Sequence, residues 1–183
     1  MTDHELPTTA YVILGMLRLG ASSGYEIKKA VQVSTRFFWT ISEAQIYPML
    51  RRLEDARLIT GRDAPTGRRR RRVYELTDLG ESALTDWLER REPTPFEVRD
   101  VAMLKLFFAD AVGEDAALDL VEQLRTRSES ELRELQGQVQ PAEELARSTG
   151  NRFPALSLQA GISVHLALIQ ASDELSASLT RAD

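Results

Sequence analysis

The sequence predicts a mainly α-helical chain in two parts. Residues 1–92 are expected to form three helices, a β-hairpin and a fourth helix, and residues 93–183 a second set of helices. Apolar residues recur at helical spacing through most of the chain. One stretch, residues 58–76, instead has strand and turn composition. Pro93 and Pro95 interrupt helix formation, which places the domain boundary beside them.

Composition excludes several classes of protein. The chain has 183 residues, of which 43% are hydrophobic, so it can build a core. It has no cysteine, which rules out disulfides, zinc-thiolate sites and thiol nucleophiles and suits a reducing cytosol. The N-terminus does not resemble a signal peptide, and no apolar run is expected to reach the ~18 residues of a membrane span. We therefore expect a soluble cytoplasmic protein without a membrane segment.

Charge is distributed unevenly over a chain of net charge −5. Residues 1–92 carry 15 basic and 13 acidic side chains, and the rest of the chain carries 8 and 15. The N-terminal part includes an uninterrupted run of five arginines, residues 68–72. This asymmetry suggests that the first part meets a polyanion and the second part has another task.

Local signals place the first three helices. Thr8–Leu19 has the apolar spacing of a buried helix. Ser23 and Glu26 have the spacing of a capping box that starts the second helix. The third helix begins after Ser42, with Gln45 in the corresponding capping position. Its stripe of Ile46, Leu50 and Leu53 must face a core. Pro48 lies inside this helix, where we expect a kink or a loosened first turn unless the helix starts later.

A hairpin and a fourth helix complete the N-terminal part. Residues 58–62 and 71–76 are predicted strands, and residues 63–67 (DAPTG) have turn chemistry. Thr77 is a candidate N-cap for a helix from Asp78 to about Arg91. Three helices, the third with a polar outer face, followed by a hairpin are typical of a winged helix-turn-helix.

In that layout the arginine run lies at the tip and along the returning arm of the wing. Arginine can bind phosphates with two hydrogen bonds and can enter narrow minor grooves. A solvated charge run without a partner is the alternative. Five like charges held in a hairpin are costly unless an anion neutralises them, so the run and the capped third helix together favour double-stranded DNA as the partner.

Four segments carry a resemblance to the PadR family of bacterial transcriptional regulators. They are SGYEIKK (23–29), FFWTISEAQIYPMLRRLEDARLI (37–59), GRRRRRVYELTDLGESAL (67–84) and RDVAMLKLFFAD (99–110). The resemblance covers most of the chain and implies a winged helix followed by a helical C-terminal dimerisation region. Many relatives have glycine where this chain has Ala56-Arg57, and the wing here is unusually rich in arginine.

The candidate DNA-binding residues come from three places. Ser42 and Gln45 lie at the third helix's N-terminus, which favours phosphate. Ser42 can also be only a cap, and Gln45 can either read a base edge or only complete the capping box. The resemblance implies that Tyr47 donates a hydrogen bond to a phosphate; a tyrosine packed under the helix is the alternative. Basic residues of the second and third helices and of the wing complete the set. The predicted contacts are Lys28, Lys29, Ser42, Gln45, Tyr47, Arg51, Arg52, Arg68, Arg69, Arg70 and Arg71.

The C-terminal part is predicted to pair two chains. Residues 114–140 show a heptad-like apolar seam, interrupted near Arg127-Ser128, and residues 153–179 are strongly apolar. So much apolar surface on few helices suggests a partner chain, whereas an intramolecular helical hairpin is the alternative. The family resemblance also implies a homodimer, which suits a pseudo-palindromic operator. The predicted interface residues are Leu158, Ile162, Leu166 and Ile169.

A regulatory ligand is expected where the two parts meet. The fourth helix carries Leu84, Trp87, Leu88 and Arg91 along one flank, and apolar pockets occur preferentially at such junctions. Relatives in the resembled family respond to phenolic or drug-like molecules, which implies a small aromatic effector for a repressor. A constitutive repressor with Trp87 in its core is the alternative.

Other functions are weaker fits to the sequence. We find no catalytic constellation, metal-ligand spacing or phosphate-binding glycine loop. Of the two histidines, His4 belongs to the N-terminal stretch and His165 to an apolar helix, where a structural histidine is the default. We therefore expect no enzyme activity, cofactor or metal. A winged-helix adaptor that binds an acidic protein through its basic hairpin is the remaining rival.

Overall fold

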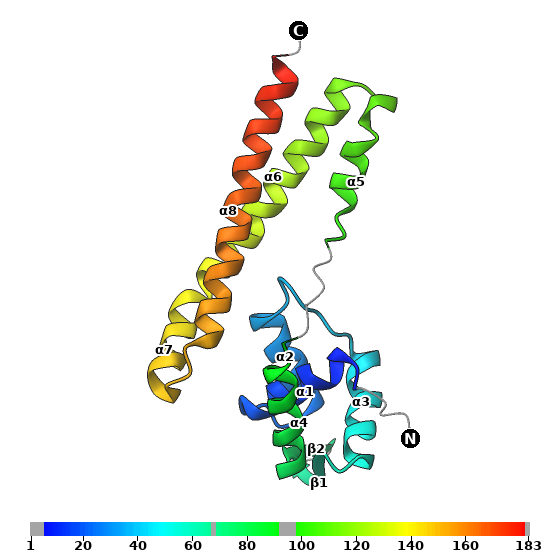
Figure 1. Ribbon diagram of the computed structural model, residues 1–183, viewed down its shortest axis with the longest axis vertical. Helices are drawn as coiled ribbons and strands as arrows, with labels where there is room; N and C mark the ends of the chain where they lie inside the picture. The colour runs from blue at the N-terminus through cyan, green and yellow to red at the C-terminus, as the bar shows by residue number, and fades with distance from the viewer. Residues whose placement is uncertain (1–5, 67–68, 92–97, 182–183) are drawn as a thin grey trace. The chain divides into compact units, whose positions relative to one another are not determined.

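A computed structural model describes residues 6–66, 69–91 and 98–181, without the side chains of residues 65, 66, 69 and 70. Two compact units divide the chain, Met1–Thr94 and Pro95–Asp183. Figure 1 labels the helices and strands of both units.

Three helices build the core of the N-terminal unit. They are α1 (Thr8–Arg18), α2 (Gly24–Ser34) and α3 (Glu43–Asp55). Each contributes one apolar face, because residues three and four apart along a helix share a side. The fully buried side chains include Ile13, Leu14, Ile27, Val31, Ile46, Leu50, Leu53 and Ile59. The predicted stripe of the third helix is therefore in the core, and its other side faces solvent.

The helix starts follow the caps, with one difference. The Ser23 hydroxyl accepts a hydrogen bond from the Glu26 N–H, as predicted, but the Glu26 carboxylate accepts from the N–H and hydroxyl of Ser22, not from Ser23. At α3, Gln45 Oε1 accepts from both the N–H and the hydroxyl of Ser42 and so completes the capping box. The helix begins at Glu43 and continues through Pro48.

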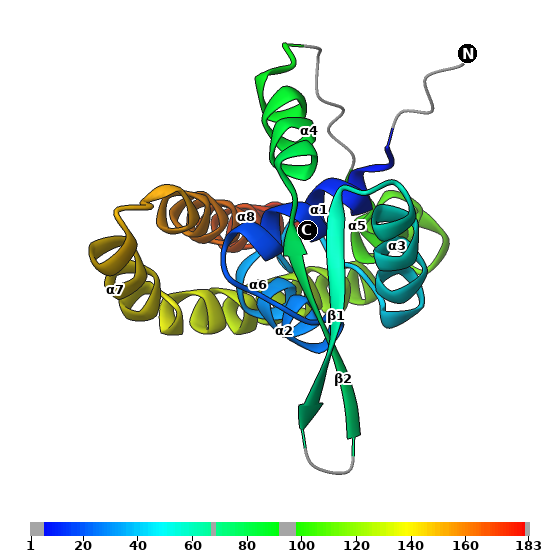
Figure 2. The ribbon, with the colours of Figure 1, turned by 90° about the horizontal axis from the view of Figure 1, so that it is seen from below.

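The wing is longer than the sequence indicated. Strands β1 (Ile59–Thr66) and β2 (Arg69–Leu76) pair antiparallel from Ile59 opposite Leu76 to Thr66 opposite Arg69. Residues 63–66, predicted as part of the turn, thus belong to β1, and Arg69 and Arg70 extend β2. The composition of residues 63–66 suggested a turn because it includes proline. In a two-stranded ribbon both strands are edge strands, and an edge strand tolerates proline. Figure 2 shows the ribbon extending past the helices of its own unit.

Two close backbone contacts fix the hairpin between α3 and α4 (Asp78–Glu89). The N–H groups of Arg57 and Leu58 bond the carbonyls of Glu54 and Leu53, so α3 ends in a Schellman motif. Arg57 adopts φ +60 at the C′ position of this motif, where glycine is usual. A Cβ at Gly80 would lie 2.0 Å from the Leu58 carbonyl oxygen, so only glycine lets α4 approach β1 this closely.

Five helical elements lie within the described part of the C-terminal unit, residues 98–181. They are α5 (Val101–Phe107), the 3₁₀ turn η1 (Ala109–Ala111), α6 (Glu114–Gly137), α7 (Val139–Thr149) and α8 (Phe153–Thr180). The long helices α6 and α8 pack along each other, and Arg125 Nε of α6 donates to Asp173 of α8 at 2.9 Å. The predicted interruption of the α6 seam near Arg127-Ser128 is not found. The small Ser128 side chain is buried in line with Leu124 and Leu135, so the seam continues through it.

Helix α8 is apolar on more than one side. Its 28 residues include an 18-residue window of mean hydropathy 1.3, long and apolar enough to cross a membrane, and only 11% of that window is buried in the chain. From the sequence we expected no apolar run of that length. Length and composition alone do not separate a membrane span from a helix that another protein chain covers.

Candidate nucleic-acid interface

The solvent side of α3 is the first part of the candidate interface. Gln45, Tyr47, Arg51 and Arg52 are exposed there, opposite the buried stripe. Tyr47 is 46% exposed, and its ring packs against Gly24 of α2, where an added Cβ would lie 2.7 Å from the ring. The ring is therefore held in place while part of it faces solvent. The predicted contact of Tyr47 with a phosphate stays a prediction, beside the alternative of a tyrosine packed under the helix.

The basic residues near α3 differ in availability. Arg51 and Arg52 take part in no ion pair within the described residues, and both side chains are exposed. Lys29 is also exposed. Lys28 bonds Glu43 Oε1 at the α3 N-terminus at 2.5 Å, and this hydrogen bond raises the pKa of the lysine. Exposed pairs of this kind exchange readily, so Lys28 remains within reach of a phosphate.

Arg71 turns back toward the helices. Its guanidinium bonds the Glu26 carboxylate and, at 3.1 Å, the Ser22 hydroxyl, and its Nε is buried without a hydrogen-bond partner among the described residues. The Ser22 carbonyl also accepts from the Tyr74 N–H at 2.8 Å, which ties β2 to the start of α2. Hydrogen bonds from Ser22, together with Arg71, hold the pKa of Glu26 below its ordinary value. A phosphate would have to compete with Glu26 for Arg71.

Arg72 makes the corresponding contact with the end of α3. Its Nη2 lies 2.5 Å from Glu54 Oε1, and its Nη1 lies 3.2 Å from Asp63 Oδ1 across the hairpin. The hydrogen bond that Arg72 donates to Glu54 is the main reason that the pKa of Arg72 is raised. The Gly61 N–H donates to the same Glu54 oxygen at 3.1 Å. Sequence reasoning missed Glu26, Glu54 and Gly61 because they are distant along the chain from the arginines.

The rest of the arginine run belongs to the far end of the wing. Arg69 and Arg70 pair in β2 opposite Thr66 and Pro65. Arg68 and the side chains of Arg69 and Arg70 lie outside the described residues. Their predicted contact with DNA stays a prediction.

The predicted effector residues fall into two groups. Leu84 is buried in the core, and Trp87 stacks on Tyr11 of α1 with ring centroids 4.6 Å apart and planes 6° apart. Leu88 and Arg91 are exposed. Leu84 thus has almost no surface for a ligand, and Trp87 has one face already covered. For these two side chains the structure matches the alternative, in which Trp87 is part of the core.

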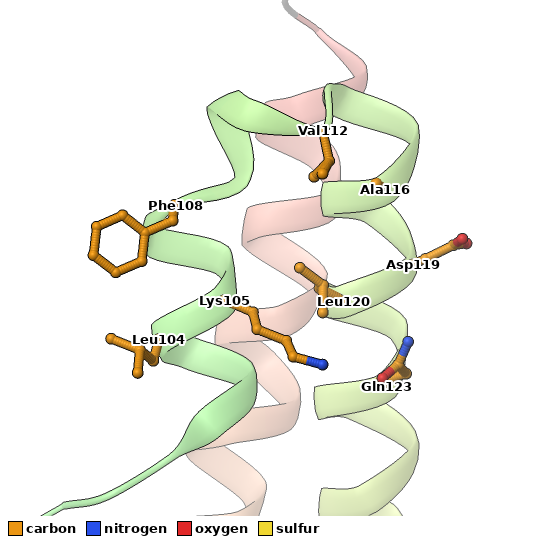
Figure 3. A pocket seen from close by; sticks show the side chains of 8 residues that line it. All are labelled: Leu104, Lys105, Phe108, Val112, Ala116, Asp119, Leu120 and Gln123. Carbon is orange, nitrogen blue, oxygen red and sulfur yellow. The ribbon is translucent and has the colours of Figure 1, made fainter.

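A pocket of about 580 Å³ lies elsewhere, between α5 and α6 of the C-terminal unit. Its lining comes from Leu104 and Lys105 of α5, Phe108 directly after that helix, Val112, and Ala116, Asp119, Leu120 and Gln123 of α6. In Figure 3 the Lys105 ammonium extends toward α6, whereas Leu104 and Phe108 point away from α6 and the Asp119 carboxylate points outward. The lining is mainly apolar, with one cation, one carboxylate and one amide.

The predicted dimer residues of α8 are mostly turned toward their own chain. Leu158 is 6% exposed, Ile162 and Ile169 are half-buried, and only Leu166 is clearly exposed. Leu158 has almost no surface left for a partner, which argues against its place in the interface. A different apolar stripe of α8 faces solvent, and its members are Phe153, Leu156, Ala160, Val164, Ala167 and Ala171. Helical spacing alone could not decide which of two apolar sides packs within the chain.

These features define the class of protein. A capped third helix with a polar, basic outer face, followed by a basic β-hairpin and a helical C-terminal unit, is a winged helix-turn-helix regulator. The PadR-like transcriptional regulator family model matches residues 13–86, and the model for the C-terminal region of virulence activator alpha matches residues 98–179. The negative transcriptional regulator PadR of Bacillus subtilis is 38% identical over 128 residues, 69% of this chain and 70% of that protein. The chain belongs to the PadR family of transcriptional regulators, which is not a family of enzymes.

Two solved structures support the assignment over nearly the whole chain. B. subtilis PadR in complex with operator DNA superimposes with a TM-score of 0.83 at 31% identity, covering 94% of this chain and 99% of that one. The same protein in complex with p-coumaric acid has a TM-score of 0.76 at 30% identity, covering 94% and 95%. The fold class predicted from sequence, a winged helix with a helical C-terminal region, is confirmed.

Proposed function

We propose that this protein is a cytoplasmic repressor that binds a pseudo-palindromic operator as a homodimer and is released by a small aromatic effector. The observation that carries the DNA-binding part is the outer face of α3, where Tyr47, Arg51 and Arg52 are exposed. The run of arginines 68–72 in the sequence of the wing adds to it. The similarity to a regulator solved on its operator supports the same partner.

Salt dependence of DNA binding tests this proposal. About four phosphate contacts per protomer and eight per dimer predict that log affinity falls with log salt concentration at a slope of roughly −7. The measurement is a fluorescence-anisotropy titration of labelled duplex at several salt concentrations. A slope near zero would exclude the electrostatic account. Alanine at Arg51 and Arg52 should reduce the slope, whereas alanine at the exposed Glu89 of α4 should leave it unchanged.

The homodimer rests on the apolar stripe of α8. Phe153, Leu156 and Val164 are large apolar side chains exposed along one side of that helix. Exposed apolar stripes of this length mark association surfaces, and twofold pairing places two recognition helices on one operator. A chain truncated after Arg91 should be monomeric and bind DNA weakly, and sedimentation equilibrium decides it. A dimeric fragment would place the interface in the N-terminal unit.

The effector proposal follows from the relative that binds p-coumaric acid. Two places compete for such a ligand in this chain. One is the surface of α4 around Trp87 and Leu88, as the sequence predicts, and the other is the pocket between α5 and α6, where Lys105 is the cation for a carboxylate. Titration of p-coumaric acid with tryptophan fluorescence, in the parent and in Trp87→Phe, separates them. A signal lost in Trp87→Phe supports the α4 site.

A ligand response that persists in Trp87→Phe and disappears in Lys105→Met places the effector in the pocket. Absence of any change in operator affinity with p-coumaric acid and related phenolic acids would leave a constitutive repressor. The adaptor rival is tested separately, by competition between duplex DNA and acidic protein for the parent. Preferential displacement by acidic protein would contradict the DNA-binding proposal.

A further inference from the structure

Two arginines in the middle of the wing, Arg71 opposite Ala64 and Arg72 opposite Asp63, are already bound to carboxylates of the helix-turn-helix. Arg71 reaches Glu26 at the start of α2, and Arg72 reaches Glu54 at the end of α3. Successive strand residues point to opposite faces of a hairpin. Arg71 and Arg72 therefore connect the two faces of the wing to α2 and α3, respectively. We name the residues Glu26, Arg71, Glu54, Arg72 and Gly61 the wing clamp.

Gly61 is an independent observation that points the same way. It lies in β1 opposite Tyr74, and its N–H donates to Glu54. A Cβ at this position would lie 2.6 Å from Glu54 Oε1 and 2.7 Å from Arg72 Nε. The carboxylate and the guanidinium therefore lie over Gly61 and use the space that any other residue would fill. The Arg72 guanidinium also lies 5.9 Å from the centroid of the Tyr74 ring, which steadies it further.

We propose that the arginine run is divided by function: Arg71 and Arg72 position the wing relative to α3, and Arg68–Arg70 supply the wing's contact with DNA. This inference rests on the proposed DNA-binding function. The angle between wing and recognition helix sets which base pairs the wing reaches while α3 occupies the major groove. The clamp is thus a specificity determinant, although its residues need not touch DNA.

The sharpest variant changes geometry without changing charge. The added methyl group of Gly61→Ala would overlap Glu54 Oε1 and Arg72 Nε. Both atoms belong to flexible side chains, so these two side chains move apart and the backbone stays in place. The proposal predicts that its affinity for the operator falls about tenfold, whereas its affinity for a random-sequence duplex and its salt slope stay at the parent values. Thermal unfolding should hardly change, because exposed ion pairs contribute little to stability.

Charge variants distinguish positioning from phosphate binding. Removing a phosphate-binding arginine from both protomers lowers the steepness of the salt slope by about 1.8 and weakens binding to all sequences. Arg70→Gln is the matched control and should behave in that way. Arg72→Gln and Glu54→Gln should instead lose operator affinity with little change of slope. The double variant Glu54→Arg, Arg72→Glu exchanges the two charges and restores an ion pair, so it should recover part of that affinity.

A measurement without DNA keeps the two proposals separable. The chain has no cysteine, so Thr66→Cys carries a single nitroxide label at the end of β1. Its electron paramagnetic resonance line shape should report a more mobile wing in Gly61→Ala and Glu54→Gln than in the parent. The clamp is overturned if the wing mobility is unchanged, or if Arg72→Gln reproduces the slope change of Arg70→Gln and the swap recovers nothing. Failure of the parent to bind DNA overturns the proposed function instead, and the mobility result still decides the clamp.

Discussion

A carboxylate at the centre of the exposed α8 stripe should dissociate the dimer. Val164 is 56% exposed in the single chain, so the side chain of Val164→Glu is solvated in the monomer and leaves its fold intact. In a twofold dimer the same side chain is buried twice. At about 3 kcal/mol for each unpaired buried charge the total is about 6 kcal/mol. The dimer dissociation constant should therefore rise by about four orders of magnitude.

Sedimentation equilibrium measures this shift. The parent should sediment at about twice the 20.6 kDa chain mass at micromolar concentration, and Val164→Glu as a monomer with unchanged helical circular dichroism. The matched control is Gln159→Glu, an exposed position roughly 140° around the helix from Val164. A dimeric Val164→Glu, or equal dissociation by both variants, would refute the assignment of the stripe to the interface.

Three further predictions concern the described contacts. Arg57→Gly should raise the free energy of unfolding by about 0.5–1 kcal/mol in urea denaturation, because φ +60 strains a side chain but not glycine; equal or lower stability would contradict this. Gly80→Ala should cost about 3 kcal/mol, since its Cβ meets the backbone oxygen of Leu58, and an unchanged melting temperature would show that α4 shifts freely. Asp100 caps α5 and bonds Arg127, and that hydrogen bond lowers the pKa of the carboxyl from 3.8. Its stabilisation is present above that value and is lost as the pH falls through the lower folded-state pKa. Asp100→Asn should therefore destabilise the protein at pH 6 but not at strongly acidic pH, and a deficit that persists in acid would contradict the assignment.

Local signals in the sequence predicted most of the N-terminal unit. Ser23, Ser42 and Thr77 mark the starts of three helices because a cap acts within three residues of chain. The apolar stripe of α3 likewise follows from helical spacing alone. The length of the wing did not follow, since residues 63–66 have turn chemistry and are strand only because β2 pairs with them.

Contacts between distant residues explain what the sequence did not reveal. Glu26 is 45 positions before Arg71, and Glu54 is 18 before Arg72, so no spacing rule connects them. The burial of Leu158, a predicted interface residue, within its own chain was not foreseen for a related reason. Both sides of α8 are apolar, and only the packing of α6 and α7 decides which side remains exposed.

Selection of binding sites from a randomised duplex library tests the central claim most directly. If the chain is a dimeric winged helix-turn-helix regulator, the selected sequences should share an inverted repeat. Their half-sites should be centred about one helical turn of DNA apart, or a multiple of that distance. Failure to enrich any sequence over the starting library, or enrichment of a single unrepeated half-site, would contradict the account.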